Sequence, residues 1–137
     1  MCAKTKPDPS ESADWLGIHP TTRVWVGGRS RAARPLIERL VGEALRPTSG
    51  PIDVAILLPT SLDEVGYFAA KLRLRMEAGG RLWVVHGRPT AQAAGGDPPA
   101  LRCTPEQVAT AVEPLGYVFR EAAVVVAHGF VAAGFGI

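Results

Sequence analysis

The stretch IDVAILLPTSLDEVGYFAAKLRLRMEAGGRLWVVHG, from Ile52 to Gly87, decides the fold because it holds a strand, a helix and a second strand in succession. The run IDVAILLP at 52–59 is apolar almost throughout, which is typical of a strand covered on both faces. The run RLWVVHG at 81–87 predicts a second buried strand of the same kind. Two such strands joined by a helix predict a parallel pair, and therefore an α/β domain.

The helix between these strands carries start and stop signals. Ser61 to Glu64, SLDE, fits a capping box, in which the serine hydroxyl and the glutamate carboxylate satisfy free backbone N–H groups. Apolar residues then recur at helical spacing, namely Val65, Phe68, Ala69, Leu72 and Met76. Gly79 and Gly80 predict the end of the helix, because glycine adopts the left-handed conformation that a Cβ atom would penalise.

A strand, a turn and a helix are also predicted upstream, in RVWVGGRSRAARPLIERL at 23–40. RVWV predicts the strand, Gly27 and Gly28 the turn, and Pro35 belongs in the first turn of an amphipathic helix. The apolar face of that helix is predicted to hold Leu36, Leu40, Val41, Ala44 and Leu45. Many α/β proteins use this arrangement to offer backbone N–H groups to an anion, so the turn is a candidate phosphate or cofactor site.

Downstream, the chain predicts a long connection, a helix and a closing pair of strands. Residues 87–103 are rich in Gly, Pro and Ala, and this connection is longer than most. TPEQ at 104–107 repeats the capping pattern before a third helix. Residues 117–137 predict two strands that reverse at His128-Gly129. We therefore predict a small, mostly parallel sheet with helices on both faces and a C-terminal antiparallel hairpin.

The bulk composition indicates one domain without a membrane or nucleic-acid partner. At 137 residues, 47% of them apolar, the chain suffices for one core and is too short for two. We expect a flexible polar tail over 1–14 and a single domain over 15–137. A net charge of +2 is far from the basic footprint of a nucleic-acid binder. The tail lacks the apolar core of a secretory signal and no run could span a membrane, so we expect a cytoplasmic protein.

The order of strands and helices is similar to the second half of a class I methyltransferase, a Rossmann-like fold. Residues 52–89 resemble more closely an uncharacterised bacterial family of short methyltransferase-like proteins, known as a domain of unknown function. LGIHPTTRVWV at 16–26 is similar to the opening of that family. Family members tend to carry a Pro-Lys pair after the central strand and a Trp in the final strand. Here 86–89 read His-Gly-Arg-Pro and the last strand is GFVAAGFGI, so no role is carried over from those residues.

The resemblance implies an S-adenosylmethionine site, but the residues that such a site needs are missing. It would need a glycine-rich turn such as GxGxG and a second strand that ends in an acidic residue for the ribose. Gly27 and Gly28 are adjacent, with no third glycine before the helix. Only RPTSGP at 46–51 separates that helix from the next strand, which leaves no room for the second strand, helix and third strand. Asp53 begins the next strand, at the wrong end for a ligand, so we expect no cofactor.

Three segments, at 27–31, 60–61 and 86–90, should converge at the carboxyl ends of the parallel strands, where ligands bind in open sheets. The turn could hold a phosphate or carboxylate through its N–H groups and two arginines, or it could be a tight turn with solvated arginines. His86 could act as an acid or base, with Asp63 or Glu64 to orient it, or it could be structural. The candidate ligand-binding residues are Gly27, Gly28, Arg29, Ser30, Arg31, Thr60, Ser61 and Arg88.

Neither histidines nor cysteines form a metal-binding pattern. His19, His86 and His128 have no close Cys, Asp or Glu at ligand spacing, and Cys2 and Cys103 form no Cys-x-x-Cys pair. We therefore expect no metal site. Cys103 precedes a predicted helix N-terminus, and it is either a thiol of lowered pKa or a buried apolar side chain.

Two further features concern the core and the surface. Trp25 and Trp83 lie within apolar strands and are expected to fill the core. The basic series at 71–77 predicts a solvated helix face, but together with the arginines of the turn at 29–31 it could receive an acidic partner.

Two functions remain open. The first is a degenerate methyltransferase-like domain without a complete S-adenosylmethionine site, acting as an accessory module that binds a small ligand or a protein. A protein partner or a second copy would then dock on an apolar patch near Phe130 and Phe135. The alternative is a small non-canonical enzyme acting on an anionic small molecule, with His86 as acid or base, Arg88 and the turn arginines binding substrate, and the 87–103 loop as a lid.

Overall fold

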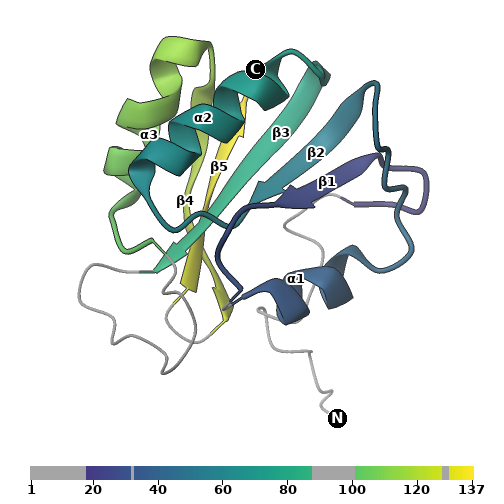
Figure 1. Cartoon of the computed structure of the whole chain (residues 1–137), viewed down its shortest axis with the longest axis horizontal. Helices are drawn as coiled ribbons and strands as arrows, with labels where there is room; N and C mark the ends of the chain where they lie inside the picture. Colours follow the sequence, from purple (N-terminus) through teal and green to yellow (C-terminus); the bar gives the residue numbers. More distant parts are fainter. Residues whose placement is uncertain (1–17, 32, 88–100, 128–129) are drawn as a thin grey trace, which may run out of the picture.

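The computed structural model describes residues 18–31, 33–87, 101–127 and 130–137, with only the backbone for 122–127. Five strands form one sheet: β1 (Val24–Gly27), β2 (Ile52–Leu57), β3 (Met76–Gly87), β4 (Val118–Ala127) and β5 (Phe130–Gly136). The helices are α1 (Arg34–Val41), α2 (Leu62–Arg73) and α3 (Pro105–Val112), followed by a 3-10 turn, η3 (Glu113–Leu115). The α/β class predicted from the sequence is confirmed (Figure 1).

The strands lie in the order β1-β2-β3-β5-β4. β1, β2 and β3 pair in parallel, and β5 pairs antiparallel with both β3 and β4. The last strand therefore runs against the other four, as predicted. Two of the four pairings are antiparallel, so the sheet is mixed and the prediction of a mostly parallel sheet holds only in part. The expected reversal at His128-Gly129 lies outside the described residues.

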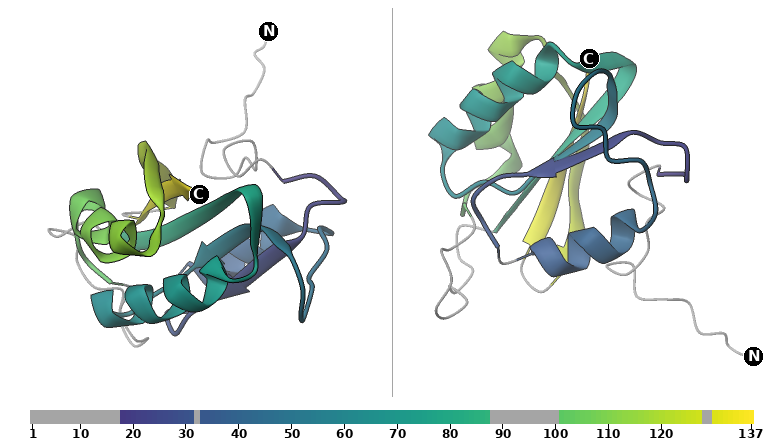
Figure 2. Two further views of the ribbon diagram at one scale, coloured as in Figure 1. Left: turned by 90° about the horizontal axis from the view of Figure 1, so that it is seen from above. Right: turned by 45° about the vertical axis from the view of Figure 1, so that its right-hand side comes forward.

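Helices cover both faces of the sheet, as predicted (Figure 2). Side chains alternate along β3, so that Leu82 and Val84 pack with α2 and α3, whereas Trp83 and Val85 pack with α1. These side chains are completely buried or nearly so. Within the described ranges, no helix is both long and apolar enough to cross a membrane.

The helix stop predicted at Gly79-Gly80 is wrong. α2 ends at Arg73, and β3 already begins at Met76. The register between β2 and β3 shifts in this region, so the two glycines form a bulge beside Asp53. Gly79 has a φ of +81°, and a Cβ atom on Gly80 would lie 3.1 Å from the Asp53 carbonyl oxygen.

Among the described residues, the outer edge of β1 gains one residue of pairing. Leu45 forms a single bridge with Arg23: its carbonyl accepts from the Val24 N–H at 2.8 Å, and its own N–H donates to Thr22 at 3.0 Å. The chain then leads through 46–51 directly into β2. Leu45 is half exposed and lies beyond the end of α1, so its predicted place on the apolar face of that helix is wrong. β1 is thus the last full strand at this end of the sheet (Figure 1).

Candidate functional site

The turns after β1 and β2 lie directly against each other. The Leu58 N–H donates to the Gly27 carbonyl at 2.8 Å, and the Leu58 carbonyl accepts from the Ser30 N–H at 2.9 Å. Gly28 has a φ of +116°, and a Cβ atom there would lie 2.3 Å from the Leu58 carbonyl oxygen. The predicted segments 27–31 and 60–61 are therefore brought together, with glycine required at their contact.

The Glu64 carboxylate joins the two turns. Its Oε2 accepts from the backbone N–H of Arg29 at 2.6 Å. Its Oε1 accepts from both the N–H and the hydroxyl of Thr60, each at 2.8 Å. Glu64 is only 8% exposed. The Glu64 carboxylate thus occupies backbone N–H groups that were predicted to bind an external anion.

The predicted capping box at 61–64 is half correct. The Ser61 hydroxyl accepts from the Glu64 N–H at 3.1 Å, so Ser61 is the N-cap of α2. The Glu64 side chain does not return to the Ser61 N–H, because its oxygens bond to Thr60 and Arg29. The second predicted box is complete: Thr104 and Gln107 exchange both hydrogen bonds at the start of α3.

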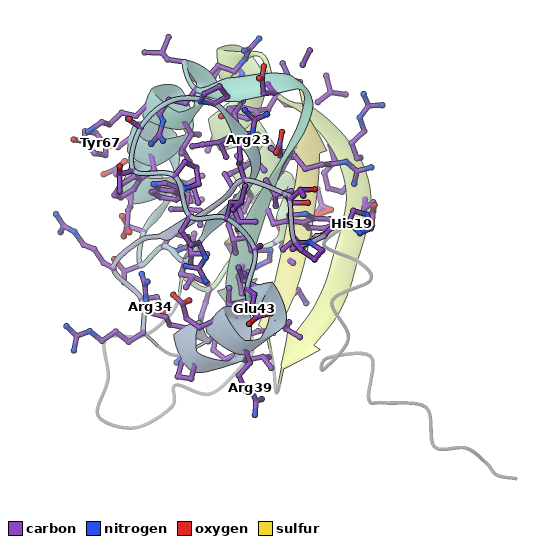
Figure 3. The ribbon with its side chains drawn as sticks, turned by 90° about the vertical axis from the view of Figure 1, so that its right-hand side faces the viewer. His19, Arg23, Arg34, Arg39, Glu43 and Tyr67 are labelled. Carbon is purple, nitrogen blue, oxygen red and sulfur yellow. The ribbon has the colours of Figure 1, made fainter. Side chains whose placement is uncertain are left out.

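The arginines of the turn differ in what they contact. Arg29 and Arg31 are exposed, and neither forms an ion pair with another described residue. Arg34, labelled in Figure 3, begins α1 and was not singled out by the sequence analysis. Its Nη2 donates to the Gly28 carbonyl at 3.0 Å, and its Nη1 lies 3.8 Å from a Glu38 carboxylate oxygen. Arg34 therefore steadies the turn, while the other two guanidiniums face solvent. The candidate Arg88 lies outside the described residues.

His86 lies at the carboxyl end of β3 but is completely buried. Its Nδ1 is 3.0 Å from the Gly87 carbonyl, and its Nε2 has no hydrogen-bond partner within the described residues. Burial lowers the pKa of the ring below its usual value, and backbone hydrogen bonds offset only part of that effect. The segment 101–103 runs across the ends of β2 and β3, since Leu101 donates to Pro59 and accepts from Gly87. The ring is therefore enclosed, and Glu64 is bonded elsewhere.

Replacing His86 with leucine should reduce the loss of stability at mildly acidic pH. Because the folded pKa is lowered, an unfolded chain binds a proton below about pH 6.5 that the folded chain does not bind. The His86 contribution to stability therefore falls as pH falls, by up to about 1.4 kcal/mol per pH unit. Urea unfolding at neutral and mildly acidic pH measures this slope. It should be reduced in His86→Leu and retained in the exposed-residue control His19→Gln; equal slopes would contradict the burial argument.

Cys103 is buried, and burial raises the pKa of its thiol to about 11. Its backbone N–H donates to the Gly87 carbonyl at 3.0 Å, which holds it beside the end of β3. Of the two interpretations of Cys103, the buried apolar thiol agrees with this position. Within the described residues, no three His, Cys, Asp or Glu side chains are grouped closely enough to hold a metal ion.

Phe130 and Phe135 are not exposed themselves, as the expected apolar patch would require. Phe135 is completely buried and Phe130 is half-buried, because β5 lies between β3 and β4 and is not at an edge. β4 is the edge strand at that end, where Phe119 is 38% exposed. A shallow groove of about 330 Å³ lies there, lined by Pro105, Glu106, Ala109, Thr110, Glu113 and Phe119.

The sequence analysis also missed a row of aromatic side chains beside the turn. Trp25, expected in the core, is half-buried, and its ring centre lies 5.6 Å from that of Phe68 on α2. Tyr67 follows edge-on to Phe68 at 5.3 Å. The Lys71 ammonium lies 5.0 Å from the Tyr67 ring centre and 3.2 Å from its hydroxyl. No local signal in the sequence distinguishes this row from the core, because Trp25 is left half-buried only by the position of β1 at the edge of the sheet.

Comparison with known proteins supports the fold. No protein-family model matches the chain, and no curated protein matches its sequence. Among solved structures, it is similar to the pyocyanin biosynthetic protein PhzM (14% identity, TM-score 0.59, covering 93% of this chain and 53% of that one). It is also similar to the mitomycin 7-O-methyltransferase MmcR (14%, 0.56, 93% and 53%) and to the S-adenosylmethionine-dependent methyltransferase SibL (13%, 0.54, 90% and 46%). The fold is methyltransferase-like, and the chain spans about half the length of these structures.

Proposed function

We propose that this chain is a methyltransferase-like domain without an S-adenosylmethionine site, and that it acts as an accessory module that binds another protein. The observation that carries the proposal is the Glu64 carboxylate, held 2.6 Å from the Arg29 nitrogen in the turn that would face a cofactor. Three hydrogen bonds hold this carboxylate, and it is almost wholly buried. A second anion at the same N–H groups would be repelled by it at close range.

The residues around the turn do not fit the cofactor. Gly28 packs against the Leu58 carbonyl, which leaves no space between the turn and the end of β2. The segment 46–51 runs directly into β2, so no strand in that segment brings an acidic residue to a ribose. Asp53, the acid at the start of β2, accepts from Arg23 through both carboxylate oxygens, at 2.8 Å and 3.0 Å. That side-chain hydrogen bonding lowers the pKa of Asp53 and ties it to β1 as a structural residue.

A protein partner is better supported than a small ligand or a reaction. The polar groups of Thr60 and Glu64 are satisfied by each other, and the His86 ring is enclosed. A general acid or base must reach the atom that it protonates, so the burial of His86 argues against the enzymatic alternative. The side chains that remain accessible to a partner are half-buried or exposed aromatic rings and solvated arginines. Aromatic residues and arginine are enriched at protein interfaces.

Native mass spectrometry of the full chain with S-adenosylmethionine and S-adenosylhomocysteine tests the missing site. We expect no saturable uptake of either compound at concentrations of about 1 mM. The variant Glu64→Ala should be measured in parallel. Uptake by Glu64→Ala alone would support exclusion by the carboxylate, and no uptake by either protein would support exclusion by the turn and the short 46–51 segment as well. Saturable uptake by the unaltered chain would overturn the proposal.

A further inference from the structure

We propose that the aromatic row, formed by Trp25, Phe68 and Tyr67, is the docking surface for an acidic, apolar segment of a different protein. This inference rests on the proposed function and names the place and the chemistry of the partner. The row begins on edge strand β1 and continues on α2, next to the turn that carries Arg29 and Arg31.

The rings are continuous and accessible. Tyr67 is 59% exposed, and Trp25 and Phe68 are half-buried. Trp25 lies over its own strand, since a Cβ atom on Gly27 would meet the indole ring at 2.5 Å. Position 27 therefore requires glycine, because a Cβ atom there would displace the indole ring of Trp25. Rigid aromatic rings that are half-buried in the free protein lose little conformational freedom on binding, which suits them as interface anchors.

The edge of β1 can accept an extended segment beside the row. The carbonyls of Arg23 and Gly27 bond to β2, and residues alternate along a strand, so the N–H and carbonyl of Val26 point away from β2. The bridge to Leu45 ends at Val24, and no described residue pairs with Val26 on that side. An added strand would gain main-chain hydrogen bonds here while its side chains contact the row.

The charge around the row favours an acidic partner. Arg29 and Arg31 are exposed without an ion pair to another described residue, and Lys71 lies over the Tyr67 ring. The first turn of α2 holds two acidic residues, of which Glu64 is buried and Asp63 is exposed. Three cationic side chains therefore face one exposed carboxylate from that turn. A segment with acidic and apolar residues complements this surface.

The geometry disfavours a nucleic acid and a second copy of this chain. Successive bases stack on ring faces that lie open side by side, whereas the planes of Trp25 and Phe68 are inclined by 46° and those of Phe68 and Tyr67 by 82°. Antiparallel pairing of β1 with β1 of a second copy would place Leu45 of each copy against the other strand. This pairing would also bring Arg29 and Arg31 of one copy near the same arginines of the other, and like charges repel.

Selection of short random peptides displayed on phage, with the full chain as bait, tests the surface and the partner chemistry together. We expect enriched peptides that combine Asp or Glu with Leu, Phe or Trp. Fluorescence polarisation should then show that Tyr67→Ala, and the double variant Arg29→Gln/Arg31→Gln, each weaken binding by about tenfold or more. Tyr67 is chosen because it is exposed, whereas Trp25→Ala would also remove part of the core packing.

Two matched variants serve as controls. Leu74→Ala removes an apolar side chain that is 89% exposed just beyond α2, and Arg39→Gln removes an exposed arginine of α1. Both should leave peptide affinity unchanged. The proposal is overturned if the enriched peptides are basic, if none of them depends on Tyr67, or if the control variants lose as much peptide affinity as Tyr67→Ala does. It is also overturned if the chain binds oligothymidylate through the row, or if it forms a dimer that Tyr67→Ala dissociates. Any of these without cofactor uptake leaves the proposed absence of the S-adenosylmethionine site intact.

Discussion

Replacing Gly28 with alanine should remove about 4 kcal/mol or more of the free energy of unfolding. The new Cβ atom would lie 2.3 Å from the oxygen and 2.6 Å from the carbon of the Leu58 carbonyl. These are backbone atoms of the residue that bonds to both Gly27 and Ser30, so no side-chain rotation relieves the contact. The φ of +116° adds strain for any residue with a Cβ atom. Urea unfolding followed by tryptophan fluorescence and circular dichroism measures the loss.

Gly50→Ala is the matched control for backbone strain. Gly50 also has a positive φ, of +83°, but a Cβ atom there would have no neighbour within 4 Å. Its replacement should cost only about 1 kcal/mol. A similar cost for both variants would mean that the contact between the turn and Leu58 contributes little, and that space remains between the turn and the end of β2. A Gly28→Ala chain that fails to fold while Gly50→Ala folds agrees with the expectation.

Signals that act over a few residues predicted their parts of the fold correctly. The apolar runs placed β2 and the inner part of β3, and TPEQ placed the start of α3 with its complete capping box. In each case the residues that carry the signal lie within the element or directly before it. The class of the fold followed from the alternation of such elements.

Features that depend on distant pairing could not be predicted in this way. The bulge at Gly79-Gly80 arises from the register of β2 against β3, so the local glycine signal suggested a helix end. Trp25 was assigned to the core because it lies in an apolar strand, but the order of strands places β1 at the edge. Glu64 had the pattern of a cap, yet one of its partners, Arg29, is 35 residues away. The candidate site depends on contacts of this second kind.

Replacing Glu64 with alanine should cost about 3 kcal/mol of stability. The carboxylate accepts from two backbone N–H groups and one hydroxyl, and removing it leaves these donors without an acceptor in a site that is almost wholly buried. Acetate or phosphate should then restore part of the loss, because a small anion can take the place of the missing carboxylate. Urea unfolding with and without each anion, at constant ionic strength, measures both effects.

Asp63→Ala is the matched control, since Asp63 is an exposed acid of the same helical turn. It loses only its interaction with the helix dipole, about 0.5 kcal/mol, and added anions should stabilise it no more than they stabilise the unaltered chain. If Glu64→Ala cost no more than Asp63→Ala, the carboxylate would not be what holds the two turns. If only Glu64→Ala responds to acetate, the turn can bind an anion and the chain fills that place itself. That result would support the proposal that the Glu64 carboxylate takes the place of a bound anion in this turn.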